Sequence, residues 1–263
     1  MKLKKICSIA IFFLHSVFLN TAFAIGTESA YISIVPLNFF PESAETLPAK
    51  EFVIYFDVYA TDFHDSHDTL IQLPESYIYY GLIENVTLYA VPRMTFNKPD
   101  GVSSKYDLGD TDLGVEYRFY HDDAESLDIA FFPVVTMPTG DRNRDLGNGK
   151  VWSQWPLWLQ KSWNDWTVYT GGGYAFNSEK DAHDFPFGGL TLQKDFVSQN
   201  FGLALEIWSQ GSPYIDDGGF TILDASVGYN FTQNFAIVLT GGQSIAGADN
   251  TIGYLAFYWQ GSI

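Results

Sequence analysis

The sequence predicts an all-β protein whose mature part is a transmembrane up-and-down antiparallel β-barrel of about twelve strands. Three observations lead to this fold. Apolar and polar residues alternate with a period of two through most of the chain, short turns alternate with longer polar connections, and aromatic residues stand beside the short turns. A soluble β-sandwich shares the first feature, whereas the three together are typical of barrels in the bacterial outer membrane.

Residues 1–24 have the features of an export signal. Lysines near the start precede the apolar run Ile6–Leu19, and Ala22-Phe23-Ala24 forms a small-x-small cleavage pattern. We therefore expect cleavage after Ala24 and three regions: the signal 1–24, a periplasmic N-terminal segment 25–50 and the outer-membrane barrel 51–263. The single cysteine, Cys7, lies inside the signal, so the mature chain is expected to contain neither thiol nor disulfide.

Charge and hydropathy narrow the class of protein further. Loss of the signal removes three of the 14 basic residues and none of the 31 acidic ones, so the formal net charge changes from −17 to −20. Nucleic acid is not expected to bind so acidic a chain. After the signal, no apolar run reaches the roughly 20 residues that a membrane-spanning helix needs. With 17% aromatic residues and 23 glycines, the composition favours a barrel over a soluble domain.

The alternation assigns one face of each strand to lipid. In DTDLGVEYRFY, Leu113, Val115 and Tyr117 share one face, while Glu116 and Arg118 share the other. LDIAFFPVVTM, FGLALEIW and LDASVGYNF follow the same rule. A charge facing lipid near the membrane centre costs about 2 to 4 kcal/mol for a cation and less for an acid, so the charged face must point inward.

This phase predicts the residues that line the lumen. They are Arg93, Glu116, Arg118, Asp128, Gln154, Glu206, Asp224 and Ser226. Because acids outnumber bases in this set, we expect a mild cation preference, which reversal potentials in planar bilayers would measure. A structural alternative for Arg118 and Glu116 is a cross-strand ladder of opposite charges.

The connections indicate the topology. The short turns HDDAES, SWND, VSQN and TQN are flanked by aromatic residues, as at a membrane interface, and longer connections lie at 97–105, 138–150, 177–184, 211–218 and 244–250. The strands expected between them are 51–61, 70–81, 85–95, 108–120, 126–137, 152–163, 166–176, 186–197, 200–209, 220–231, 235–244 and 250–259. An even number places both chain ends in the periplasm. Pro74 interrupts the second strand, and ten or fourteen strands are alternatives.

The loop TGDRNRDLGNG (139–149) resembles a calcium-binding loop because Asp141, Asn143 and Asp145 alternate. An EF-hand needs glycine at its sixth position and glutamate at its twelfth, where this chain has Leu146 and Trp152. We therefore interpret the stretch as an outward-facing barrel loop. No metal site, catalytic residue or cofactor is predicted.

The segment 25–50, IGTESAYISIVPLNFFPESAETLPAK, does not alternate. It is too apolar for a solvated tail, and its three prolines make a full membrane strand unfavourable. Our hypothesis is a plug that folds into or against the periplasmic mouth and restricts the lumen. A disordered leader and one extra strand are the alternatives.

Four stretches resemble a known family, the outer-membrane transporters grouped under the meta-pathway of phenol degradation. They are LGDTDLGVEYRF (108–119), FPVVTMPTGDRNRDLGNG (132–149), WPLWLQKSWNDWTVYTGGGYAFN (155–177) and VGYNF (227–231). The resemblance runs from about residue 76 to the end. It implies an outer-membrane channel of a Gram-negative bacterium, with outer-membrane lipid and the barrel assembly machinery as partners, and suggests a small hydrophobic or aromatic solute.

Two other functions stay open. A barrel enzyme, such as a lipase or protease, would need a histidine beside a nucleophile. The histidines after the signal are His64, His67, His121 and His183, and His64-Asp65-Ser66-His67-Asp68 is their only dense cluster. A structural or adhesive barrel would use its long loops, which are short for that purpose. Trp152, Trp155, Trp158 and Trp163 would stack on an aromatic solute where they face inward.

Overall fold

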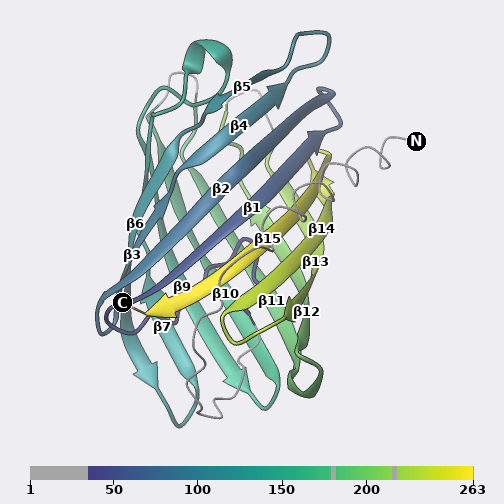
Figure 1. The fold of residues 1–263 in the computed structure, drawn as a ribbon. Helices are drawn as coiled ribbons and strands as arrows, with labels where there is room; N and C mark the ends of the chain where they lie inside the picture. Colours follow the sequence, from purple (N-terminus) through teal and green to yellow (C-terminus); the bar gives the residue numbers. More distant parts are fainter. Residues whose placement is uncertain (1–34, 179–181, 215–217, 263) are drawn as a thin grey trace, which may run out of the picture. The chain divides into compact units, whose positions relative to one another are not determined.

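The computed structural model describes residues 35–178, 182–214 and 218–262, and these residues form a closed antiparallel β-barrel (Figure 1). The predicted signal 1–24 and its cleavage point lie outside the described residues. None of the described helices is long and apolar enough to cross a membrane. The all-β prediction is confirmed.

Fifteen strand segments make up twelve passes through the barrel wall. Nine passes are single strands: β1 (Glu51–Phe63), β2 (Asp68–Ile83), β9 (Trp152–Trp163), β10 (Trp166–Asn177), β11 (Phe185–Phe196), β12 (Phe201–Gln210), β13 (Phe220–Asn230), β14 (Phe235–Gly247) and β15 (Asn250–Ser262). The other three passes each contain two segments: β3 (Val86–Val91) with β4 (Arg93–Lys98), β5 (Lys105–Leu108) with β6 (Thr111–Asp122), and β7 (Leu127–Phe131) with β8 (Val134–Met137). The predicted count of twelve is therefore confirmed.

Pairing between the first and last strands closes the barrel. β1 pairs with β15 from Glu51↔Ser262 to Phe63↔Asn250, without a register shift, and pairs with β2 on its other side. Closure removes the open edges that a sandwich would leave.

Some strand boundaries differ from the prediction. Two of the differences occur at prolines, and a third occurs at residues 109–110, between β5 and β6. Proline donates no backbone hydrogen bond, and Pro92 and Pro133 divide the expected strands 85–95 and 126–137. Their carbonyls still accept from the neighbouring strands: Ser76 N lies 3.0 Å from Pro92 O, and Val115 N lies 3.2 Å from Pro133 O. Pro74, expected to interrupt the second strand, lies instead within continuous β2, at a register shift.

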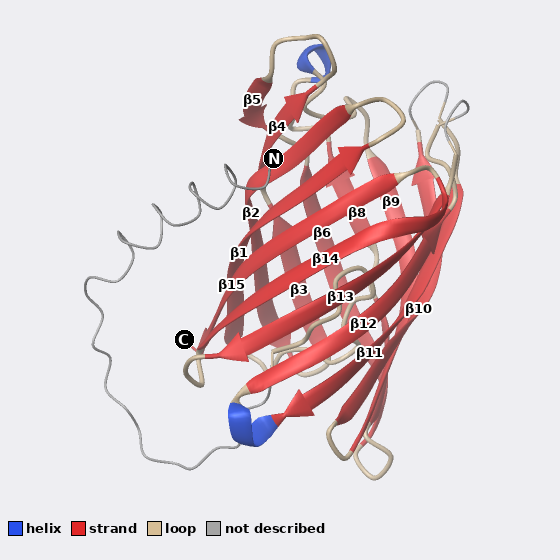
Figure 2. Cartoon of the chain, turned by 90° about the vertical axis from the view of Figure 1, so that its right-hand side faces the viewer, coloured by secondary structure: helices blue, strands red, loops and turns tan. Residues whose placement is uncertain are grey.

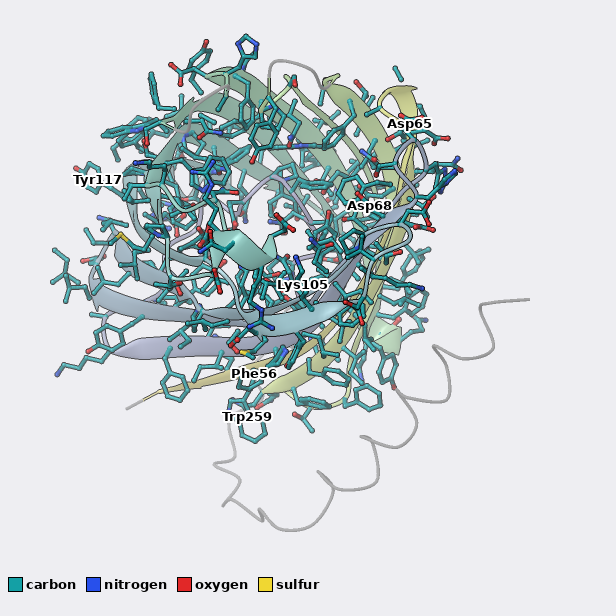
Figure 3. All side chains as sticks on the ribbon, turned by 90° about the horizontal axis from the view of Figure 1, so that it is seen from above. Phe56, Asp65, Asp68, Lys105, Tyr117 and Trp259 are labelled. Atoms are coloured by element: carbon teal, nitrogen blue, oxygen red, sulfur yellow. The ribbon has the colours of Figure 1, made fainter. Side chains whose placement is uncertain are left out.

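The outer wall is apolar, as the alternation predicts. The side chains of Leu205 and Tyr117 are 61% and 52% exposed, whereas Glu206, next to Leu205, is 1% exposed. Phe56, Tyr117 and Trp259 point away from the barrel in the view from above (Figure 3). A wall of this kind is stable against hydrocarbon and unfavourable against water.

The two ends of the barrel differ. The short-turn end carries aromatic residues, where Phe196 and Phe201 stack with ring centroids 4.6 Å apart and η2 (Val197–Gln199) joins their strands (Figure 2). The opposite end carries the longer loops. One loop is shorter than expected, because β14 continues to Gly247 and leaves only Ala248 and Asp249 before β15.

The loop 138–151 contains the turn η1 (Arg142–Arg144), and ionic contacts attach it to the tips of neighbouring strands. The Asp110 carboxylate accepts the backbone N–H groups of Gly140 and Asn148 at 3.0 and 2.7 Å. Arg144 Nη1 lies 2.5 Å from Asp107 Oδ2, and Lys105, labelled in Figure 3, lies 3.0 Å from Asp145 Oδ2. Within the described part of the chain, no three histidine, cysteine or acidic side chains are grouped as metal ligands.

Candidate functional site

Residues 35–50, which we call the N-terminal segment, lie inside the barrel against side chains of its inner wall. The segment begins at the short-turn end, where Val35 N lies 3.2 Å from Asn230 Oδ1 at the end of β13. Leu37 N then donates to Gln193 Oε1 of β11 at 2.8 Å. Val35 and Leu37 are both buried.

The apex of the segment is held by one carboxylate. The backbone N–H groups of Phe39 and Phe40 donate to the two oxygens of Glu206 at 2.8 and 2.9 Å. The ring of Phe40 stacks on Trp208, with centroids 5.0 Å apart and planes 13° apart. The ring of Phe39 packs against Tyr254 at 4.8 Å.

The segment then returns to the short-turn end across the opposite wall. Ser43 Oγ lies 2.6 Å from Gln160 Oε1 of β9, and Leu47 N lies 2.9 Å from Thr87 Oγ1 of β3. Lys50 N donates to Gly81 O at 2.7 Å, near the end of β2. The N-terminal segment therefore forms a loop that enters and leaves at the same end of the barrel.

Glycines on the inner wall make room for this loop. A Cβ atom built on Gly228 would lie 2.5 Å from Leu37 Cδ2, and one on Gly189 would lie 3.2 Å from Pro41 Cγ. At Gly81 the added Cβ would lie 1.9 Å from Pro48 O. Any larger residue at Gly228 or Gly81 would overlap the segment.

Aromatic side chains line much of the remaining interior. Trp158, Phe187 and Trp208 form one group, in which Trp208 lies 6.3 Å from Trp158 and 5.5 Å from Phe187 between ring centroids. A second group consists of stacked tyrosines: Tyr55 lies 4.3 Å from Tyr77 and 4.2 Å from Tyr258. Of the four tryptophans considered above, Trp152 and Trp158 point inward, while Trp155 and Trp163 are exposed on the outside.

The structure places the predicted lumen residues on the inward side of their strands. Glu116, Asp128, Glu206, Asp224 and Ser226 are buried, and Gln154 is half-buried in the inward phase of β9. They do not form one site. Glu206 and Asp224 pair in register on β12 and β13, and Ser226 also lies on β13, whereas Glu116, Asp128 and Gln154 lie on β6, β7 and β9.

The two predicted cations are both neutralised. Arg93 pairs with Asp112 and, through Nε at 2.8 Å, with Glu75. Arg118 Nη1 lies 3.1 Å from Asp128 Oδ1, so this ion pair joins β6 to β7 and does not involve Glu116, the partner in the structural alternative. Whether these residues line a conduction path stays a prediction.

Two inner acids form no ion pair among the described residues. Neither oxygen of Asp57 and neither oxygen of Asp224 accepts a hydrogen bond, although the two residues are only 2% and 3% exposed. A buried ionised group without a partner is costly, so such positions are uncommon without a functional reason.

The histidines occupy the barrel ends. His64 Nδ1 lies 3.0 Å from Asp249 Oδ2, and His64 Nε2 lies 3.2 Å from Thr251 Oγ1. These contacts follow from the pairing of β1 with β15, which aligns Asp62 with Thr251. His121 lies between Asp123 and Asp128 at the short-turn end.

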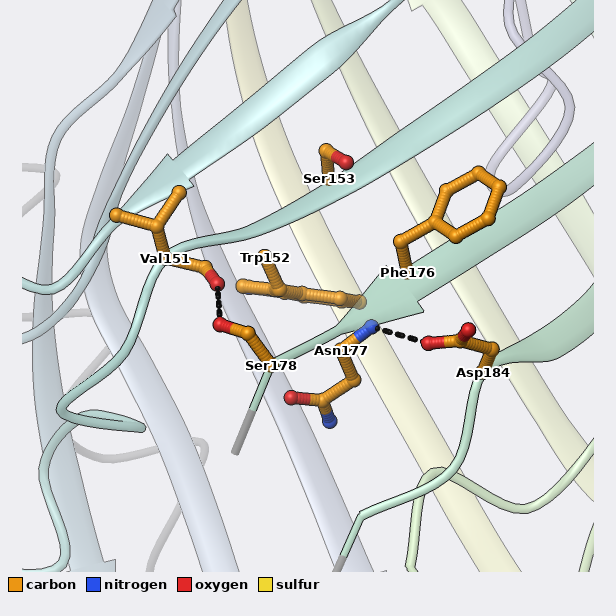
Figure 4. Close-up of a pocket in the computed structure, with 7 residues that line it drawn as sticks. All are labelled: Val151, Trp152, Ser153, Phe176, Asn177, Ser178 and Asp184. Carbon is orange, nitrogen blue, oxygen red and sulfur yellow. Dashed lines mark hydrogen bonds between the residues drawn. The ribbon is translucent and has the colours of Figure 1, made fainter. Parts of the chain in front are cut away.

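A shallow pocket opens at the long-loop end of β9 and β10 (Figure 4). Its lining residues are Val151, Trp152, Ser153, Phe176, Asn177, Ser178 and Asp184. Two hydrogen bonds close its floor: Ser178 Oγ donates to Val151 O at 2.5 Å, and Asn177 N donates to Asp184 Oδ1 at 2.9 Å. These contacts join loop ends and gather no charged group around a nucleophile.

Sequence reasoning missed most residues that hold the N-terminal segment: Thr87, Gln160, Gln193 and Asn230. Each lies in the inward phase of its strand. For Gln160, Gln193 and Asn230 an inward-facing amide is the available signal, whereas the hydroxyl of Thr87 gives none. The pattern of a single strand does not reveal which other part of the chain supplies the partner.

Glu42 makes the contacts of the segment sensitive to pH. It lies outside the membrane-spanning strands and accepts a hydrogen bond from Tyr79 Oη at 3.4 Å. Burial raises the pKa of Glu42 from about 4.5 to about 7; the Tyr79 hydrogen bond opposes this rise, and the nearby Glu206 adds to it. The carboxyl groups of Glu116 and Glu42 also repel each other when both are charged.

We predict that the segment is released as the pH rises. The bound segment holds a proton on Glu42 that the released segment does not, so binding is strongest below the ordinary pKa and weakens as the pH rises to about 7. Single-channel conductance should therefore increase between about pH 5 and pH 8. Glu42→Gln should flatten this profile. A profile that persists in Glu42→Gln would contradict the assignment.

Comparison with known proteins gives one family and a set of similar folds. A model of the family described as "Putative MetA-pathway of phenol degradation" matches residues 38–260. A comparison with curated protein sequences finds no match. An outer membrane channel from Pseudomonas putida F1 superposes with a TM-score of 0.67 at 17% identity, over 85% of this chain and 100% of that chain.

Two further structures share the barrel. KdgM porin has a TM-score of 0.52 at 9% identity, over 78% of this chain and 98% of that chain. The translocator domain of the autotransporter NalP from Neisseria meningitidis also has a TM-score of 0.52 at 9% identity, over 80% and 87% of the two chains. At such identities the likeness is one of fold. The apolar outer wall of this chain is of the kind that faces lipid in membrane barrels.

Proposed function

We propose that this chain, which belongs to the family described as "Putative MetA-pathway of phenol degradation", is an outer-membrane channel for small hydrophobic or aromatic compounds. The observation that carries the proposal is the aromatic inner wall, in which Trp158, Phe187 and Trp208 contact one another beside the N-terminal segment. Such a surface favours flat apolar molecules over hydrated sugars.

The N-terminal segment acts as a plug in this proposal. Its contacts with the wall are hydrogen bonds and ring packing, which can break and re-form without any change in the strands. Residues 25–34 extend the segment toward the signal and lie outside the described residues. The signal 1–24 directs export, and the barrel assembly machinery inserts the barrel. The barrel region in this proposal is 51–263.

Catalysis has less support than transport. Among the described residues, His64 and His121 lie at the barrel ends, and the inner acids Glu75, Asp112 and Asp128 form ion pairs with Arg93 and Arg118. The similar structures named above are described as a channel, a porin and a translocator domain. A structural or adhesive role would leave the inner wall without a purpose.

Uptake into liposomes tests the proposal. We expect proteoliposomes to take up phenol and toluene at least several times faster than empty liposomes, while arabinose and glycine enter little faster, because the plug and the aromatic wall oppose hydrated solutes. The measurement is radiolabel uptake for the apolar compounds and swelling for the polar ones, with heat-denatured protein as the control. Preference for sugars over aromatic compounds would overturn the proposal.

A further inference from the structure

Phe40 presents a recognisable small-molecule skeleton to the barrel wall. Its backbone nitrogen lies 2.9 Å from Glu206 Oε1, and its ring stacks on Trp208 with centroids 5.0 Å apart. The atoms that run from this nitrogen through Cα and Cβ to the phenyl ring are those of 2-phenylethylamine. Glu206 and Trp208 of the wall therefore bind a nitrogen donor and an aromatic ring that are separated by two carbon atoms.

Among the described residues, no cation is paired with the two acids at this place. Glu206 receives only neutral donors: the N–H groups of Phe39 and Phe40, and the Thr191 hydroxyl at 2.6 Å. Asp224 pairs with Glu206 in register, and neither of its oxygens accepts a hydrogen bond. Across the described chain, no ion pair from a basic side chain reaches either acid.

The wall around Trp208 is shaped to hold a flat ring. Gly189 lies opposite Trp208 in the pairing of β11 with β12, and a Cβ atom at Gly189 would lie 2.8 Å from the Trp208 ring. Because that Cβ is absent, the indole lies against the backbone and leaves its other face to the Phe40 ring. Gly242 similarly leaves room for Asp224, since an added Cβ would lie 2.4 Å from Asp224 Cβ.

We propose that Glu206, Asp224 and Trp208 form a binding site for 2-arylethylammonium ions, which Phe40 occupies in the plugged barrel. The ammonium takes the place of the Phe40 nitrogen at Glu206, on the strand that pairs with the strand of Asp224, and the aryl ring takes the place of the Phe40 ring on Trp208. A full positive charge suits this pair of acids better than a neutral N–H does, because charge-assisted hydrogen bonds are about twice as strong. Ligand and segment compete, so binding releases the apex.

This inference rests on the proposed channel function and narrows its solute. Among aromatic compounds of similar size, the site selects by charge: phenylacetate meets two carboxylates and is repelled, and ethylbenzene leaves both acids unpaired. Ethylammonium has the charge but lacks the ring that contacts Trp208.

Calorimetric titration of the full mature protein in detergent tests the site. We expect 2-phenylethylammonium to bind at least about 10-fold more tightly than ethylammonium, and phenylacetate to give no signal. Phe40→Ala should tighten 2-phenylethylammonium binding about 10-fold, because the competing ring is gone. Asp224→Asn should weaken it about 10-fold, since the ammonium loses one carboxylate. Asp57→Asn, which changes a buried inner acid on β1, is the matched control and should bind as the unmodified protein does.

Several outcomes would overturn the inference: equal binding of phenylacetate, no gain in Phe40→Ala, or equal loss in Asp224→Asn and Asp57→Asn. The heat-dependent gel mobility of folded barrels identifies variants that fail to assemble, and Trp208→Leu then replaces Asp224→Asn, with loss of the preference over ethylammonium as its expected result. The two proposals fail separately. If aromatic compounds are taken up but 2-phenylethylammonium does not bind, only the proposed site is contradicted. If 2-phenylethylammonium binds but aromatic compounds are not taken up, only the proposed channel function is contradicted.

Discussion

Deletion of residues 25–48 is expected to leave a folded barrel and to raise its single-channel conductance severalfold. The part of this stretch that the structure describes crosses the interior from Asn230 to Thr87 and contributes no strand. β1 begins at Glu51 and finds its partners in β2 and β15, so the wall does not need the deleted residues. Water can satisfy the inner side chains that lose a partner, such as Glu206 and Gln193.

Planar-bilayer recording measures this effect, and the heat-dependent gel mobility of barrels reports folding. Pro36→Ala, at an exposed position of the same segment, is the matched control and should conduct as the unmodified protein does. Unchanged conductance in a folded deletion would show that the segment does not restrict the lumen. Loss of folding would show that it stabilises the barrel wall.

The fold follows from local patterns that each strand carries by itself. FGLALEIW and LDASVGYNF each place mainly apolar residues on one face and an acid on the other, so lipid outside and a polar lumen inside suffice to orient them. The number of passes could be counted for the same reason. Boundaries near Pro92 and Pro133 could not, because whether a proline ends a strand depends on hydrogen bonds from its neighbours.

The candidate site was only half predictable. The inward phase places Glu206 and Asp224 in the lumen, and the two strands that carry them are adjacent in sequence. Phe39, which donates to Glu206, lies 167 residues from it, and its stretch of sequence has no alternation that would place it. The tilt and shear of the whole barrel decide which inner residues lie at the same height along its axis. The sequence of a single strand does not determine them.

The inner glycines provide a second way to expel the segment without altering it. Gly228→Leu is expected to raise conductance nearly as much as the deletion does. An added Cβ at this position would lie 2.5 Å from Leu37 Cδ2 and 3.0 Å from Val35 Cγ1, so a leucine and the bound segment cannot share the space. Overpacking of this kind typically costs about 1 to 3 kcal/mol, which is comparable to the gain from burying one leucine such as Leu37.

Gly241→Leu is the matched control for this substitution. Gly241 lies on the neighbouring strand β14, and nothing stands within 4 Å of a Cβ built there, so the wall changes while the segment does not. The decisive measurement is the double variant. If Gly228→Leu acts by expelling the segment, it should add no conductance in the 25–48 deletion, because the two changes then act on one interaction. Two results would contradict this mechanism: a further increase of conductance in the double variant, or a conductance of Gly228→Leu alone equal to that of the unmodified protein. Either would show that the glycine does not act through the segment.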